Sequence, residues 1–246
     1  GAWFRFNFYA GKTVCAENTT NLVFSKNFGD NIGVPTFLVA FGGEVRYESY
    51  EIDQGEEASW SSKDPEFEPG SQGFPGFRPS NSIERTRNSA AVYGGIETDI
   101  TDRFFAGAGA RYENYSDFGE NISGKIMGRY TLDEIFTLRG AISTGFRAPS
   151  LHQKYYSSTS TIFIQGQEGL MPFEVLTANN DSRVAKAFGV NELEEETSLN
   201  ISGGITSEIN ENTILTIDAY QIDIDDRIVL SGYFTRFDPN VSELLT

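Results

Sequence analysis

The side chains with catalytic potential in this chain are carboxylates and guanidinium groups that recur at every second position. Glu44, Arg46 and Glu48 form one such series, and Arg111 and Glu113 form another. Paired carboxylates can act as general acid and base. Opposite charges on neighbouring strands more simply form cross-strand ion pairs along a wet wall. The same interpretation covers Glu97, Lys125, Arg129 and Arg139.

The composition argues against enzymes and against several kinds of binding site. The chain has one histidine, His152, and one cysteine, Cys15. A His/Cys metal cluster and most nucleophile–base pairs are therefore excluded, and we expect no catalytic residue, metal or cofactor. The net charge of −16 repels polyanions, so we expect no nucleic-acid partner. The aspartates of 223–226 lack the glycine and the distal glutamate of a calcium loop, which favours a structural role.

Long stretches that alternate with period two must position these charges. Phe104, Ala106 and Ala108 share one face of such a stretch, while Phe105 and Arg111 share the other. This alternation predicts an antiparallel sheet with two unlike faces. We expect eight strands, at 21–28, 37–50, 88–99, 103–115, 121–131, 135–146, 197–208 and 213–231. In the last, the apolar phase slips by one residue between Ala219 and Tyr220, which predicts a β-bulge.

Most connections between these strands alternate between short turns and long segments, and the connection after the fourth strand, at 116–120, is also brief. The long ones cover about 51–87 and 147–196. Short turns at one rim and long loops at the other are typical of outer-membrane barrels, in which the apolar face contacts lipid. We therefore predict an all-β fold, an antiparallel meander of long strands that is part of a large transmembrane β-barrel. No apolar run has the length of a transmembrane helix, and no signal peptide is visible.

Several segments, taken in this order, resemble the barrel of TonB-dependent outer-membrane receptors. They are Val39–Glu48, Arg111–Gly119, Glu196–Asn200 and Tyr220–Ile228, with Ser143–Leu151 (STGFRAPSL) as the most specific. Together the matching residues extend from 21 to about 232, which is most of the chain.

The resemblance implies a bacterial outer-membrane location and a plugged barrel of about 22 strands. Such receptors take up a scarce ligand, an iron chelate, cobalamin or a glycan, with energy supplied through the TonB complex. The chain departs from the family because its plug domain, its energy-coupling box and its last strands are not visible. We therefore expect residues 1–246 to be a partial barrel. The implied partners are outer-membrane lipid, the receptor's own plug domain, the TonB complex and a small-molecule or oligosaccharide ligand.

Aromatic side chains in the two long segments are the candidate ligand contacts, because exposed rings can stack on sugars or flat chelates. The candidates, with one neighbouring arginine, are Trp60, Phe74, Phe77, Arg78, Tyr155, Tyr156 and Phe163. Packing of the loops onto each other is the alternative role. On the inner face, we expect Arg46, Arg111, Arg139 and Arg147 to face the lumen or plug. Arg147 either pairs with an interior acid or contacts plug or ligand.

Two other folds fit the same pattern. A soluble β-sandwich that acts as a carbohydrate-binding module would bury Val39, Phe41 and Ala108 between two sheets. A small barrel that closes on its own eight strands would pair the first strand with the last.

Overall fold

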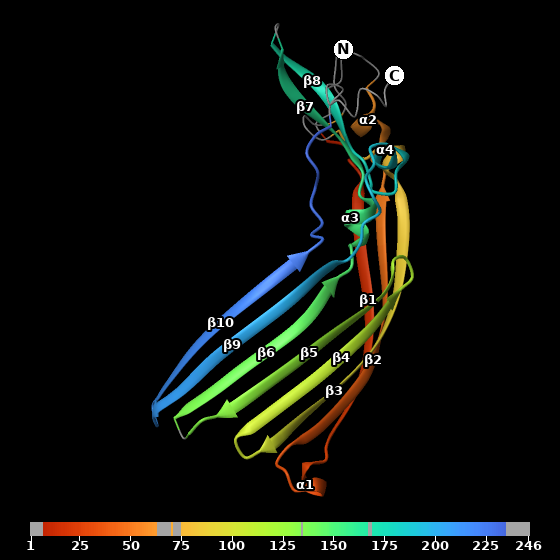
Figure 1. Cartoon of the computed structure of the whole chain (residues 1–246). Helices are drawn as coiled ribbons and strands as arrows, with labels where there is room; N and C mark the ends of the chain where they lie inside the picture. Colours follow the sequence, from red (N-terminus) through yellow and green to blue (C-terminus); the bar gives the residue numbers. More distant parts are fainter. Residues whose placement is uncertain (1–6, 63–69, 71–74, 134, 167–168, 235–246) are drawn as a thin grey trace.

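The computed structural model describes residues 7–62, 70, 75–133, 135–166 and 169–234. Eight strands form one antiparallel sheet in the order β1-β2-β3-β4-β5-β6-β9-β10, and β7 and β8 form a separate hairpin (Figure 1). The strands of the sheet are β1 (Lys12–Asn27), β2 (Phe37–Asp53), β3 (Ile83–Thr101), β4 (Phe104–Tyr115), β5 (Gly119–Thr131), β6 (Phe136–Arg147), β9 (Glu196–Asn210) and β10 (Thr213–Asp225). The other elements are α1 (Gly29–Ile32), α2 (Glu57–Trp60), a 3-10 turn η1 (Pro79–Asn81), α3 (Leu151–Tyr155), β7 (Ser158–Gly166), β8 (Gly169–Thr177) and α4 (Arg183–Ala187).

One face of the sheet is apolar and uncovered. The register places Val39, Ile96, Ala108, Ile126 and Ile142 in one row across β2 to β6. Ile126 in this row is 63% exposed, so no second sheet within the described ranges lies over it. The β-sandwich alternative is therefore wrong. A broad apolar surface of this kind needs a hydrocarbon environment, which supports its contact with lipid.

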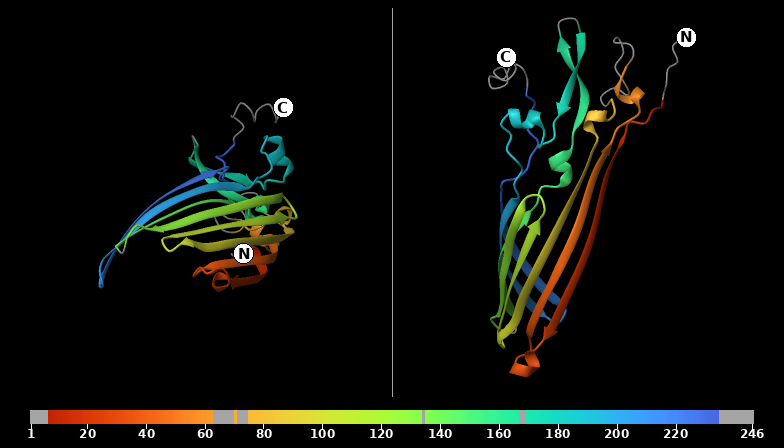
Figure 2. Two further views of the ribbon diagram at one scale, coloured as in Figure 1. Left: turned by 60° about the horizontal axis from the view of Figure 1, so that its bottom comes forward. Right: turned by 90° about the vertical axis from the view of Figure 1, so that its right-hand side faces the viewer.

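The sheet curves without closing on itself. Its two edges are β1 and β10, which do not pair with each other. The left view of Figure 2 shows the sheet bent into part of a cylinder. The prediction of a partial barrel wall is confirmed, and the alternative of a self-closed eight-stranded barrel is wrong.

Several strands are longer than the alternation predicts. β1 begins at Lys12, well before the expected 21, while β2 continues to Asp53 and β3 begins at Ile83. These extensions lie towards the long-loop end, where the inner face of β2 packs against the loops through Tyr50 and Ile52 and the outer positions Ser49, Glu51 and Asp53 are polar. Without a lipid-facing side, no apolar alternation is required, and the sequence gives no periodic signal there. The segment between β2 and β3 is correspondingly shorter than expected, and 147–196 contains α3, β7, β8 and α4.

The predicted β-bulge in the last strand is wrong. β10 pairs with β9 without interruption across Ala219 and Tyr220, and the only register shift in this ladder lies at Thr213/Ile214. The side chains of Tyr220 and Ile222 therefore share the inner face with Asp218. The apolar side chains of β10 thus change from its outer face to its inner face after Ala219, and the outer face becomes polar at Gln221.

Four of the short connections lie at one end of the sheet, whereas the short turn between β4 and β5 lies at the other. The four join β1 to β2 through α1, β3 to β4, β5 to β6, and β9 to β10, as the lower part of Figure 1 shows. The segments between β2 and β3 and between β6 and β9 lie at the opposite end, from which the β7–β8 hairpin projects (Figure 2). No helix in the described ranges is long and apolar enough to cross a membrane.

Candidate functional site

The inner face carries the ion pairs that the alternating charges predict. Glu44 accepts hydrogen bonds from Nη2 of Arg46 at 3.1 Å and from Nη2 of Arg111 at 3.0 Å. Arg111 also pairs with Glu113, whose other carboxylate oxygen accepts the hydroxyl of Tyr115 at 2.7 Å. Arg46 and Arg111 thus belong to one hydrogen-bonded network across β2 and β4. Ion pairs within β2 and β4, together with the Arg111–Glu44 pair that joins these two strands, account for these charges.

Arg139 reaches over one strand to its partner. Its Nη2 donates to Oδ2 of Asp218 at 2.7 Å, from β6 across β9 to β10. The strand between them carries Gly204 at this position, where a Cβ atom would lie 2.1 Å from Oδ1 of Asp218. The absence of a side chain at Gly204 therefore makes room for this ion pair.

Arg147, at the end of β6, pairs with an interior acid, as one of the two predicted roles requires. Its Nε and Nη2 donate to the two oxygens of Glu196, at 2.8 and 2.7 Å. The backbone N–H of Ile228 donates to the same carboxylate at 2.8 Å. Glu196 therefore joins the ends of β6 and β9 to the segment that follows β10.

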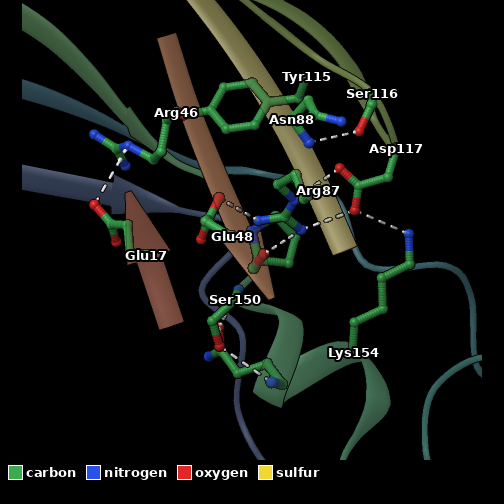
Figure 3. Close-up of polar contacts among 12 residues, drawn as sticks. Glu17, Arg46, Glu48, Arg87, Asn88, Tyr115, Ser116, Asp117, Ser150 and Lys154 are labelled. Atoms are coloured by element: carbon green, nitrogen blue, oxygen red, sulfur yellow. Dashed lines mark hydrogen bonds and ion pairs between the residues drawn. The ribbon is translucent and has the colours of Figure 1, made fainter. Parts of the chain in front are cut away.

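A buried arginine, Arg87 on β3, binds partners from several segments at the end of the wall that carries the long segments (Figure 3). Only 2% of Arg87 is exposed. Its Nε and Nη2 donate to the two oxygens of Asp117, each at 2.8 Å, and Nη2 donates to the carbonyl of Pro149 at 2.8 Å. Glu48 lies 3.8 Å from its Nη1. We call Arg87, Asp117, Pro149 and Glu48 the Arg87 junction.

The rings of Tyr115 and Phe118 complete the surroundings of Arg87. Its guanidinium lies 5.8 Å and 5.5 Å from the two ring centroids, and the rings stack on each other. Lys154 of α3 approaches the same Asp117 at 3.6 Å. Planar stacking combined with two-pronged hydrogen bonding is a geometry that arginine can adopt and lysine cannot.

The segment with the most specific resemblance, Ser143–Leu151, is bound along much of its length. Arg147 pairs with Glu196, and the buried Pro149 supplies its carbonyl to the Arg87 junction. Ser150 caps α3, because its hydroxyl accepts the N–H of Gln153 at 3.1 Å. Leu151 enters an apolar cluster. The motif is therefore a structural junction at which the chain leaves the wall.

This apolar cluster lies between the inner face of β2 and the loops. It contains Tyr50, Ile52, Phe77, Leu151 and Tyr155. Burial raises the pKa of Tyr50, which lies beyond the lipid-facing band, to about 12. Phe77 and Tyr155 are 7% and 9% exposed, so packing of the loops occupies their rings and leaves them unavailable to a ligand.

The other predicted loop contacts are more accessible. Trp60 is half-buried and donates its Nε1–H to the carbonyl of Gly55 at 3.0 Å. Tyr156 is half-buried beside His152, with ring centroids 4.7 Å apart. Arg78 pairs with Glu174 of β8, and Phe163 on β7 is 38% exposed. Phe74 lies outside the described residues. These side chains are spread over the β2–β3 segment, the turn after α3 and the β7–β8 hairpin, and they do not form one pocket.

The described residues contain no group of three or more His, Cys, Asp or Glu side chains that could hold a metal ion. In β10, Asp223 and Asp225 lie on the outer face by the register with β9, and Asp226 follows the strand. They are therefore separated in the way that strand alternation predicts.

The sequence pattern did not identify Arg87 or Glu196 as residues that join several segments. Neither stands out by spacing, because each lies near the end of a strand where the alternation fades. One signal was available: Asp117 and Pro149 lie in two of the segments that resemble the receptor family. Both contact Arg87.

Comparison with known proteins identifies the family. Residues 3–241 match the family described as "TonB dependent receptor-like, beta-barrel". An 80-residue stretch is 32% identical to the "Iron-regulated outer membrane virulence protein" of Vibrio cholerae serotype O1 (strain ATCC 39541 / Classical Ogawa 395 / O395), covering 31% of this chain and 12% of that protein.

Solved structures have the same fold. The siderophore receptor PirA from Pseudomonas aeruginosa aligns with a TM-score of 0.62 and 17% identity, over 94% of this chain and 36% of the receptor. PirA from Acinetobacter baumannii aligns with a TM-score of 0.54 and 18% identity, over 87% of this chain and 27% of the receptor. The chain therefore belongs to the TonB-dependent receptors and forms part of the β-barrel wall with which they cross the bacterial outer membrane.

Proposed function

We propose that this chain is part of a receptor that takes up an iron chelate across the outer membrane. The observation that carries the proposal is the 32% identity to an iron-regulated outer membrane protein, within a fold shared with two siderophore receptors. Cobalamin and glycans, the other ligand classes expected for the family, have no comparable support. Energy from the TonB complex and a plug domain in the complete protein are further parts of the proposal.

Capture of the ligand takes place at the end of the wall that carries the long segments. Tyr156 and Phe163 offer rings for stacking on a flat chelate, and Trp60 offers a third. Arg78 adds a cation, although Glu174 pairs with it in this structure. Phe77 and Tyr155 support the loops from beneath. Below the mouth, Arg46, Arg111, Arg139 and Arg147 line the passage.

Uptake by the full-length protein tests the proposal. A Gram-negative host that lacks its own catecholate receptors would express the protein and receive ⁵⁵Fe-labelled enterobactin. We expect cell-associated iron well above that of the empty vector, and its loss when the host lacks TonB. Uptake of radiolabelled cyanocobalamin or maltodextrin without uptake of iron would contradict the proposed ligand class. Iron uptake that persists without TonB would contradict the proposed energy source.

Variants then test the contact residues. Phe163→Ala and Tyr156→Ala should each weaken binding of the labelled chelate about tenfold, the usual effect of removing an aromatic anchor. Phe163→Tyr is the matched control, because it retains the ring and should bind within about twofold of the wild type. Equal affinity of all three variants and the wild type would exclude these rings from the site.

A further inference from the structure

The ladder between β5 and β6 ends before either strand does. Its last pair is Lys125 with Ser143, although β5 begins at Gly119 and β6 ends at Arg147. β4 remains paired with β5 as far as Gly119, and β9 remains paired with β6 as far as Arg147. The upper wall is therefore divided into two half-sheets along a seam, formed by residues 119–124 of β5 and 144–147 of β6.

Side chains replace the missing ladder across the seam. The hydroxyl of Thr144 accepts the N–H of Gly124 at 3.0 Å. The ring of Phe146 lies edge-on to that of Tyr115, with centroids 6.0 Å apart. These contacts join the half-sheets where backbone hydrogen bonds do not.

The chain that leaves β6 then bridges the half-sheets. We call residues 148–157 the strap; it leads from β6 to the inner side of β2 and β3, where α3 packs. Arg87 holds its beginning through the carbonyl of Pro149, and the pair between Lys154 and Asp117 holds its helix. His152 contacts the hydroxyl of Tyr50 through Nδ1 at 3.1 Å. The strap ends directly before the β7–β8 hairpin.

Arg87 dominates among these anchors because it is a buried cation with defined acceptors. A buried charge is strongly destabilising unless it is paired and hydrogen-bonded. Arg87 meets this condition with the carboxylate of Asp117 and the carbonyl of Pro149, which belong to the β4–β5 turn and to the strap. Detaching the strap would leave one of its donors without its acceptor.

We infer that Arg87 is a positioning residue for ligand capture: it pins the strap across the seam and thereby fixes the β7–β8 hairpin over the mouth. Arg87 itself is buried and does not touch the ligand. The inferred effect on the ligand rests on the proposed function, whereas the effect on the strap is independent of it.

Hydrogen–deuterium exchange of the full-length receptor in detergent tests, without any ligand, whether Arg87 holds the strap. In Arg87→Met, which preserves much of the side-chain length, amides of 148–157 should exchange at least about tenfold faster, because a fully buried ion pair has lost one partner. Arg87→Lys should behave similarly, since lysine cannot reproduce the two-pronged contact. Lys12→Met is the matched control: it removes a cation that pairs with Asp53 at 3.0 Å at the exposed end of β1 and should leave 148–157 unchanged.

Binding of ferric enterobactin to the same variants tests the consequence. We expect at least about tenfold weaker binding by Arg87→Met and wild-type affinity for Lys12→Met, with the lower part of the barrel equally protected in both. Unchanged exchange at 148–157 in Arg87→Met would overturn the inference, and so would weaker binding without faster exchange. If Arg87→Met does not fold, Asp117→Asn provides the same comparison with a smaller expected effect. If 148–157 exchange faster in Arg87→Met but the wild type binds no chelate, the proposed function is contradicted. The role of Arg87 in holding the strap would still stand.

Discussion

Glu196 holds Arg147 with both oxygens of its carboxylate, at 2.8 Å from Nε and 2.7 Å from Nη2. The two residues are direct partners in the β6–β9 ladder, at the end of the sheet that carries the long segments. The same carboxylate also accepts the N–H of Ile228. A single acid therefore ties two strands of the wall to the chain beyond β10.

This arrangement makes the attachment of Ile228 sensitive to pH. The hydrogen bond from Arg147, followed by that from Ile228, lowers the pKa of Glu196 from 4.5 to about 2. Because the folded pKa lies below the unfolded one, the stabilisation is complete above about pH 4.5 and is lost as the pH falls towards 2. We expect the amide ¹⁵N shift of Ile228 in the folded receptor to titrate with the carboxyl of Glu196, whose pKa is about 2. Glu196→Gln should abolish the titration, while Glu208→Gln, at the opposite end of β9, should leave it as in the wild type.

Two adjacent glycines of β2 should respond differently to substitution. A Cβ atom on Gly42 would lie 2.5 Å from the ring of Tyr93 and 2.7 Å from the carbonyl of Leu22. Gly42→Ala should therefore displace Tyr93 from Asn21, which it contacts at 2.6 Å, and lower the free energy of unfolding by about 1–3 kcal/mol. Gly43→Ala meets only the carbonyl of Ala91 at 3.5 Å and is the control. Thermal unfolding in detergent measures both; equal midpoints would refute the steric explanation.

A charged side chain near the middle of the apolar face should be destabilising. Ile126 lies in the row of outward apolar side chains and is 63% exposed. Ile126→Arg places a guanidinium in hydrocarbon at a cost of about 2–4 kcal/mol near the bilayer midplane. We expect less folded, heat-modifiable receptor in the outer membrane. Ile126→Phe keeps the surface apolar and should assemble normally, and equal assembly of the two variants would argue against lipid contact at this position.

A buried amide joins the two long segments. Asn81 is 3% exposed; its Nδ2 donates to the hydroxyl of Ser157 at 2.9 Å, and its Oδ1 accepts the N–H of Arg78 at 2.9 Å. Asn81→Ala leaves these groups without partners, at a cost of about 1–3 kcal/mol. Limited proteolysis should cut the segment between β2 and β3 sooner than in the wild type. Asn212→Ala, in an exposed turn, should not change the cleavage rate.

The sequence predicted the strands of the barrel wall better than it predicted the structure at the long-loop end. Alternation located the strands wherever one face contacts lipid, because only there must every second residue be apolar. Above that band the requirement disappears, and the first part of β1 went unrecognised. In β10 the apolar residues change from the outer face to the inner face after Ala219, which resembles a bulge in the sequence, although the ladder is continuous at Tyr220.

In the candidate site, too, some residues could be predicted from the local sequence, whereas others depend on tertiary contacts. The charged inner positions could be predicted, because cross-strand neighbours of opposite sign form pairs, as Arg46 of β2 and Glu17 of β1 do. The loop aromatics could be found but not sorted into buried and exposed, since the burial of Phe77 and the exposure of Phe163 depend on tertiary contacts. Arg87 depends on partners far away in the chain, and no local pattern reveals such a residue.

The order of the strands also has a consequence for how this wall assembles. Every ladder of the sheet joins strands that follow each other in the chain, except the one between β6 and β9. Consecutive hairpins close small loops and form early, whereas pairing β6 with β9 closes the whole stretch that contains the strap and the β7–β8 hairpin. The wall should therefore form as two hairpin arrays, and their joining at β6 and β9 should be the slowest of its pairing steps.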